Sequence, residues 1–166
     1  MKYAGIIYND FAAAPGVSLT FFTQGCPHRC PGCHNPETWD FDKGLDFTEE
    51  TMQSIINGLY LNGIKRNFCL MGGEPLCAEN LDLSLKIIKT IKETYDWVKI
   101  YIWTGYTYEI LMRIKSPKVN EILSLSNVII DGPYIEKLKH TSLNMRGSSN
   151  QRIIDLTKEK KNGIIK

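Results

Sequence analysis

Strand-type and helix-type segments alternate along this 166-residue chain, and the alternation limits the fold more than any other feature. Four short, largely apolar runs predict strands at 17–23 (VSLTFFT, rich in β-branched and aromatic residues), 67–71 (NFCLM), 98–103 (VKIYIW) and 127–130 (NVII). Apolar residues recur at helical spacing between these runs. Strand and helix repeated in this order predict a parallel sheet built from βαβ units.

Local signals place the expected helices. Thr48 is a typical N-cap, and the apolar spacing after it continues towards Gly63, a plausible stop. Asn80 is expected to cap a second helix. A third helical segment begins near Tyr108 and is interrupted at Pro117, because proline lacks the amide that an inner helical turn needs.

The length and the number of strands narrow the architecture. Four strands are too few for a closed eight-stranded barrel, which needs about 200 residues or more. We therefore expect one domain over residues 1–166, an α/β fold with an open or partial (βα) barrel and a parallel sheet of about four to six strands. The charged tail at 158–161 (KEKK) is expected to be a solvated end.

Composition excludes several function classes. The 20 Lys and Arg residues nearly balance the 18 Asp and Glu residues, so charge gives no reason to expect a nucleic acid as partner. The apolar runs have the length of strands, which predicts no transmembrane helix and no membrane partner. The first residues (MKYAGIIYNDF) lack the pattern of a signal peptide, and a cytoplasmic location is expected.

Unusual residues follow all four expected strands. They are Gln24-Gly25-Cys26, Gly72-Gly73-Glu74-Pro75, Thr104-Gly105-Tyr106 and Asp131-Gly132-Pro133. The carboxyl ends of parallel strands lie at one edge of a sheet, where ligands bind in this class of fold. The sequence therefore predicts a ligand site at that edge.

Three of the five cysteines stand within eight residues, in the segment CPHRCPGC. The spacing C-x₃-C-x₂-C of Cys26, Cys30 and Cys33 suits three irons of a [4Fe-4S] cluster and leaves the fourth iron open. The alternative is a structural zinc ion, with His28 or His34 as fourth ligand. An odd number of cysteines argues against a disulfide framework.

The remaining cysteines, Cys69 and Cys77, are eight positions apart across a strand end and a turn, which is a poor spacing for chelation. Cys69 lies in an apolar strand and is expected to be a buried apolar side chain.

The cysteine segment resembles the cluster motif of the radical S-adenosylmethionine (SAM) superfamily. Longer segments resemble one family within it, the activating enzymes of the anaerobic ribonucleoside-triphosphate reductase. These segments are CPGCHNPETWDF, MGGEPL, WTGYTYEIL, VIIDGPYI and RGSSNQRIID, and together they cover nearly the whole chain. The three-cysteine motif marks the superfamily, whereas RGSSNQR points to this family.

The resemblance implies a reaction. Cys26, Cys30 and Cys33 would hold the cluster, whose open iron is chelated by the amino and carboxylate groups of SAM. An electron then breaks the bond between the sulfonium and C5′, giving methionine and a 5′-deoxyadenosyl radical. That radical removes a hydrogen atom from a glycine near the C-terminus of the reductase. A flavodoxin-like protein is the electron donor expected of the family.

The resemblance also implies roles in binding SAM. Gly72, Gly73 and Glu74 match a segment that lies against the methionyl amino group, where glycines permit a close backbone approach and a carboxylate complements an ammonium. The stretch that contacts adenine in relatives corresponds to Gly32, Cys33 and His34. Many superfamily members carry an aromatic residue at the position of Gly32.

Other residues keep two interpretations. Thr104 and Asp131 stand at strand ends and are expected either to reach the ribose or methionyl carboxylate, or to serve as turn or cap residues. A polar cluster, Arg146, Asn150, Gln151 and Arg152, either binds SAM or the reductase, or forms a solvated loop.

The chain departs from the family at two places. Ser18 stands where relatives carry an arginine, and Met71 stands where serine or threonine is common.

Two other functions remain open at this point: a radical SAM enzyme for a small molecule, such as a 7-deazapurine-forming synthase, and a zinc-stabilised interaction domain. The small size favours a macromolecular substrate, because an incomplete barrel leaves a lateral opening.

Overall fold

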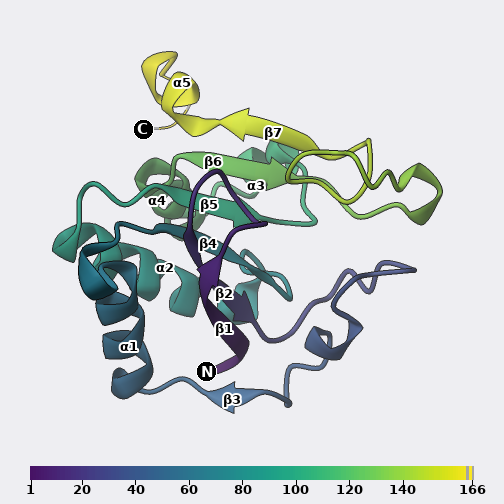
Figure 1. Cartoon of the computed structure of the whole chain (residues 1–166). Coiled ribbons are helices and arrows are strands. Elements are labelled where there is room, and N and C mark those ends of the chain that lie inside the picture. Colours follow the sequence, from purple (N-terminus) through teal and green to yellow (C-terminus); the bar gives the residue numbers. More distant parts are fainter. Residues whose placement is uncertain (164, 166) are drawn as a thin grey trace.

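A computed structural model describes residues 1–163 and 165 and contains one seven-stranded sheet in the order β3-β1-β2-β4-β5-β6-β7 (Figure 1). The strands are β1 (Lys2–Asp10), β2 (Ser18–Thr23), β3 (Leu45–Asp46), β4 (Asn67–Gly72), β5 (Ile100–Trp103), β6 (Val128–Asp131) and β7 (Arg152–Asp155). The helices are α1 (Glu49–Leu59), α2 (Ala78–Thr94), α3 (Tyr108–Ile114), α4 (Pro117–Leu125) and α5 (Leu156–Lys161).

The centre of the sheet agrees with the sequence analysis, and its edges do not. Strands β2, β4, β5 and β6 pair in parallel and match the four predicted runs. Three antiparallel strands were missed: β1 pairs with β2, β3 pairs with β1, and β7 pairs with β6. The sheet is therefore mixed, open and seven-stranded, and the expectation of a parallel sheet with about four to six strands was wrong.

The helix signals were largely correct. Thr48 caps α1 by accepting a hydrogen bond from the Thr51 amide, and the predicted break at Pro117 separates α3 from α4. Asn80 does not cap α2, because that helix already begins at Ala78. The 158–161 tail is not a free end but part of α5, from which Lys160 donates a hydrogen bond to the carbonyl of Ser126. No helix within the described residues has both the length and the apolarity needed to cross a membrane.

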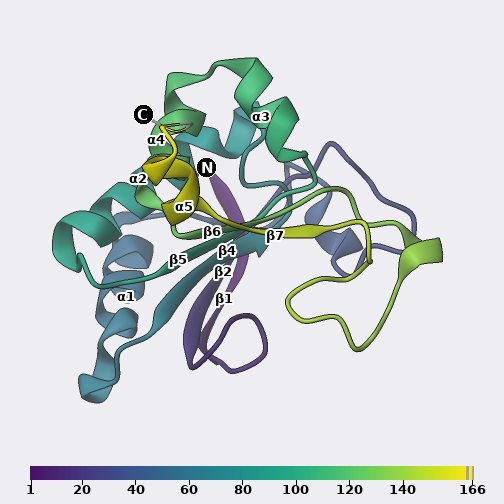
Figure 2. The same cartoon turned by 90° about the horizontal axis from the view of Figure 1, so that it is seen from above.

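The two faces of the sheet differ because successive side chains along a strand point in opposite directions. One face is mainly apolar and packs on the helices in the main core, with Leu19, Phe21, Phe68, Leu70, Ile100 and Ile102 all fully buried. The other face carries Thr20, Cys69, Met71, Tyr101 and Trp103. In Figure 2, α2, α3 and α4 lie on one side of the strands, and the turn between β1 and β2 lies on the other.

Arg152 ties β7 to the rest of the fold. Its guanidinium donates hydrogen bonds to both carboxylate oxygens of Asp131 in β6, and also to both oxygens of Glu109 in α3, at 2.9 and 2.7 Å. Asp131 is buried, whereas Glu109 is exposed. The hydrogen bonds from Arg152 lower the pKa of Glu109 to about 2.

This contact predicts a pH-dependent effect of Glu109→Gln. The ionised form of Glu109 is favoured in the folded state, so its contribution to stability is complete above about pH 4.5 and is lost as the pH falls towards about 2. The variant should melt at a lower temperature than wild type at pH 6, and the difference should narrow below pH 4.5. Circular-dichroism melts of the metal-free protein test this. The exposed Glu93 on α2 gives the control variant Glu93→Gln, and a gap that is independent of pH would contradict the assignment.

Candidate functional site

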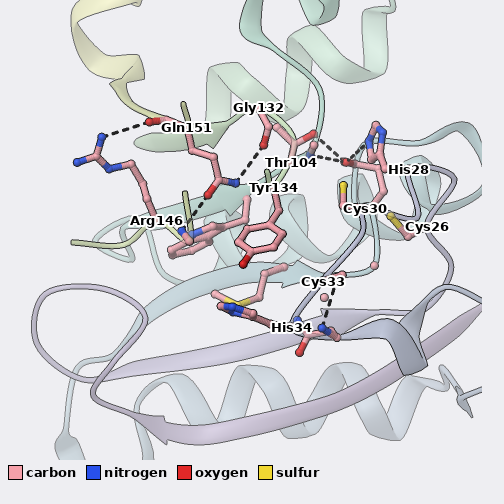
Figure 3. Close-up of a pocket in the computed structure, with 18 of the residues that line it drawn as sticks. Cys26, His28, Cys30, Cys33, His34, Thr104, Gly132, Tyr134, Arg146 and Gln151 are labelled. Carbon is pink, nitrogen blue, oxygen red and sulfur yellow. Dashed lines mark hydrogen bonds and ion pairs between the residues drawn. The ribbon is translucent and has the colours of Figure 1, made fainter. Parts of the chain in front are cut away.

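A cavity of about 480 Å³ lies at the carboxyl ends of the parallel strands (Figure 3). All four strand-end motifs contribute to its lining, through Cys26, Gly72, Gly73, Glu74, Thr104, Gly105 and Gly132. Cys30, Cys33 and His34 line it as well. The segments that follow β2 and β6 both extend beyond this edge of the sheet (Figure 1). The predicted gathering of these motifs at one edge is therefore confirmed as a matter of geometry.

The cysteine segment is a closed loop with a fixed base. Where the loop starts, the amide of Gly25 donates to the carbonyl of Thr38 at 2.7 Å, and the amide of Cys26 donates to Trp39 at 3.1 Å. Inside the loop, the Cys33 amide donates to the carbonyl of Cys30 at 3.1 Å. These bonds hold the three thiols on one short stretch of chain beside the cavity.

A four-iron cluster and a single zinc ion place different demands on the spacing of the three thiols. The described residues contain no group of three His, Cys, Asp or Glu side chains that could hold one metal ion. Zinc would need its sulfur ligands about 2.3 Å from one point. In a four-iron cluster each thiolate binds a different iron, so the ligands stand further apart.

Burial raises the pKa of the Cys26 thiol, although backbone amides of His28 and Arg29 oppose this shift. Burial also raises the pKa values of Cys69 and Cys77 to about 12. Cys69 is fully buried on its strand, as the sequence predicted. Neither Cys69 nor Cys77 lines the cavity, and at neutral pH both are inert thiols.

The glycine pair after β4 serves the packing of two loops. A side chain at Gly73 would place its Cβ 2.3 Å from the carbonyl oxygen of Gly25, and one at Gly72 would meet the backbone of Phe22 and Thr23. Gly72 also has a φ of +104°, which glycine adopts without strain. Both glycines line the cavity, but the close approach they permit is to the chain after β2.

Glu74 is fully buried, and its carboxylate accepts four hydrogen bonds. Oε1 accepts from the Leu76 amide at 2.9 Å and from the Thr104 hydroxyl at 2.8 Å. Oε2 accepts from the Gly105 amide at 2.7 Å and from His28 Nε2 at 2.8 Å. These donors belong to the loops after β2, β4 and β5, so one carboxylate joins three loops.

Asp131 and Thr104 have different positions relative to the cavity. Thr104 lines the cavity, with its hydroxyl on Glu74. Asp131 does not line the cavity. Its carboxylate accepts from the Tyr108 amide at 2.7 Å, at the start of α3, and is paired with Arg152. Asp131 therefore binds the first amide of α3 and the guanidinium of Arg152, whereas the N-cap of α3 is Thr107.

The region expected to receive adenine contains a ring that the sequence analysis missed. Cys33 and His34 line the cavity, whereas Gly32 does not and instead packs near the carboxylate of Glu136. The ring centroids of His34 and Tyr134 are 5.2 Å apart, and both side chains line the cavity. Tyr134 stands directly after the Asp131-Gly132-Pro133 motif, which was the available signal. Figure 3 shows its ring near the middle of the view.

The RGSSNQR segment closes the cavity on the far side from the cysteines in Figure 3. The Gln151 side chain donates to the carbonyl of Gly132 at 3.0 Å and accepts from the amides of Gly147 and Ser148. Asn150 donates to the carbonyl of Pro133 at 2.7 Å. These bonds fold the connection between β6 and β7 into a fixed wall. Gln151 and Arg146 line the cavity, whereas Asn150 and Arg152 do not.

Of three further residues, Met71 and Trp39 line the cavity, whereas Ser18 does not. Ser18 is fully buried, and within the part of the chain that the structure describes its hydroxyl has no hydrogen-bond partner. Met71 lines the cavity and packs with the second apolar cluster. Trp39 lines the cavity, and its buried indole N–H has no hydrogen-bond partner among the described residues. An unpaired donor at this place fits a ligand or cluster that offers an acceptor.

Asn80 connects the cysteine loop to the loop after β4. It lies buried in α2, and its side-chain amide donates to the carbonyls of Gly25 at 3.1 Å and Glu74 at 3.0 Å. Asn80 was expected to cap a helix, since a side chain directed at two distant carbonyls leaves no periodic signal in the sequence.

Comparisons with known proteins agree with this geometry. A family model described as a 4Fe-4S single cluster domain matches residues 12–154. Three of the similar proteins are each named anaerobic ribonucleoside-triphosphate reductase-activating protein. The relative from Escherichia coli K12 is 38% identical over 152 residues, which are 91% of this chain and 96% of the relative. The relative from Pasteurella multocida is 35% identical over 159 residues, which are 95% of this chain and 99% of the relative. The relative from phage T4 is 35% identical over 156 residues, which are 92% of this chain and 93% of the relative.

The contacts of Asn80 predict a loss of stability in Asn80→Ala. Two hydrogen bonds to buried carbonyls disappear, so the free energy of unfolding should fall by about 1–3 kcal/mol. Urea unfolding of the metal-free protein measures this. The exposed Asn120 on α4 gives the control variant Asn120→Ala, which removes the same group without such contacts. Equal stability of the two variants would disprove the role of Asn80.

Proposed function

Because this chain belongs to the family of anaerobic ribonucleoside-triphosphate reductase-activating proteins, we propose that it activates that reductase by radical SAM chemistry. The substrate of the protein would be a glycine near the C-terminus of the reductase, which becomes a glycyl radical. The observation that carries the proposal is the closed loop of three thiols beside a cavity into which all four strand-end motifs project.

In this proposal Cys26, Cys30 and Cys33 hold a [4Fe-4S] cluster, which the match to a 4Fe-4S domain supports. When bound, the cluster supplies the electron that breaks the bond between the sulfonium and C5′ of SAM. Three cysteines leave one iron without a protein ligand, and this is where SAM would bind. The open seven-stranded sheet would then be a partial (βα) barrel of the radical SAM type, formed by residues 1–166 as one domain.

The cavity offers each part of SAM a matching surface. Glu74, Gly72 and Gly73 are assigned to the methionyl amino group, since a carboxylate accepts hydrogen bonds from an amine. Cys33 and His34 are assigned to adenine. The Tyr134 ring, tilted by 51° against His34, supports this because it adds a second aromatic surface for the adenine ring.

The apolar side chains of Met71, Trp103 and Met145 line the same cavity and would keep water away from the reacting carbon. A radical at C5′ can abstract a hydrogen atom from nearby C–H and S–H bonds, so exclusion of small molecules protects it.

The reductase would reach the cavity from its open side. Strands β3 and β7 form the two edges of the sheet, so the sheet does not surround the cavity on all sides. An opening of this kind suits a loop of a protein substrate. We assign the electron supply to a flavodoxin-like protein, and we propose that the reaction takes place in the cytoplasm.

Cleavage of SAM tests the proposed chemistry directly. The anaerobically reconstituted protein, reduced with dithionite, should bind iron and form 5′-deoxyadenosine from SAM. Cys30→Ala should abolish this product, because only two cysteine ligands remain on the loop. Cys69→Ala is the matched control, since it removes a thiol that does not line the cavity. Product formation by Cys30→Ala would refute the ligand assignment, and zinc in place of iron would refute the cluster.

Radical formation on the anaerobic reductase tests the proposed partner. Incubation with the anaerobic reductase, SAM and reductant should produce an organic radical with an electron paramagnetic resonance (EPR) signal. The splitting of this signal should collapse when the reductase is labelled with α-deuterated glycine. A protein that cleaves SAM but gives no radical on the reductase would instead be an enzyme for another substrate.

A further inference from the structure

The carboxylate of Glu74 has no free position for a ligand. A carboxylate offers about four acceptor sites on its two oxygens. All four are taken by the amides of Leu76 and Gly105, the Thr104 hydroxyl and the imidazole of His28. A ligand that donates a hydrogen bond to Glu74 must therefore replace one of these donors.

Only one of the four donors can leave without disturbing the fold. Two are backbone amides of the loops after β4 and β5. The third, Thr104, is buried. The fourth is the side chain of His28, which is 20% exposed and lines the cavity. Rotation of one side chain removes it from Glu74, whereas the other donors require backbone movement or a change in the buried region.

The position of the imidazole depends on the absence of a side chain at residue 105. A Cβ at Gly105 would lie 2.5 Å from His28 Cδ2 and 2.7 Å from Nε2. The ring is also held by an edge contact with Tyr106, with centroids 4.6 Å apart. Gly105 has no positive φ, so alanine is compatible with its backbone. Alanine at this position would therefore push the imidazole away from Glu74 and leave the Gly105 amide in place.

We propose that His28 occupies the place of the methionyl amino group on Glu74 Oε2 and is displaced when SAM binds. This inference rests on the proposed function. His28 lies between two cysteines of the loop, so its release changes a contact between that loop and the chain after β4 and β5. SAM must break the hydrogen bond between His28 and Glu74, and this lowers its apparent affinity.

The opposite role for His28 makes the opposite prediction. If the imidazole held Glu74 in position for the ligand, its removal would weaken SAM binding. If the imidazole competes with the ligand, its removal strengthens binding. The sign of the change in the dissociation constant (Kd) therefore separates the two roles.

The experiment measures ligand binding to the anaerobically reconstituted protein without reductant, so that no cleavage occurs. Calorimetry gives Kd for SAM and for 5′-methylthioadenosine, which lacks the amino and carboxylate groups. In His28→Ala and in Gly105→Ala, Kd for SAM should fall on the order of tenfold, while Kd for 5′-methylthioadenosine should change little. The two variants reach the same state by different substitutions, so a folding defect in one leaves the other informative.

His34→Ala is the control, because His34 lines the same cavity without contacting Glu74. It should change both Kd values by the same factor. An unchanged or raised Kd for SAM in His28→Ala and Gly105→Ala, relative to 5′-methylthioadenosine, would overturn the displacement. Failure of the wild-type protein to bind SAM at all would overturn the proposed function itself, so the two failures are distinguishable.

Discussion

A buried carboxylate organises the functional edge of this protein. Removing the Glu74 side chain from water carries a large cost unless every acceptor site is satisfied. The chain meets this requirement with donors from three loops that follow three different strands. The same loops carry the first cysteine, the glycine pair and the Thr104 region. Their relative positions therefore depend on one set of hydrogen bonds, to which Asn80 adds two from α2.

The central sheet could be predicted from the sequence because its strands are buried and apolar. β2, β4, β5 and β6 carry largely apolar runs, and helix signals such as Thr48 and Pro117 lie between them. The edge strands lack this signal. β3 consists of two exposed residues. β1 and β7 are partly exposed, and each pairs with a mostly buried strand, β2 or β6. An edge strand is defined by its partner, so its own residues predict it poorly.

The candidate site could be predicted in its residue types but only partly in its contacts. The motifs at strand ends correctly indicated one shared edge, since parallel strands impose this. The motifs did not reveal that Gly73 packs on Gly25, that Asp131 pairs with Arg152, or that Tyr134 lines the cavity. These facts depend on which neighbour lies beside each loop. Such neighbours are set by tertiary packing and leave no local pattern.

The order of strands in the sheet has a consequence for how the chain assembles. Each strand pairs with one that precedes it in the sequence: β2 with β1, β3 with β1, β4 with β2, and so on to β7 with β6. The sheet can thus grow outward in the order in which a ribosome delivers the strands, without opening a pair already formed. The cysteine loop emerges early and gains its fixed neighbours when the loops after β4 and β5 arrive. The RGSSNQR segment is the last of the cavity-lining segments in the sequence, so this wall forms after the other parts of the cavity.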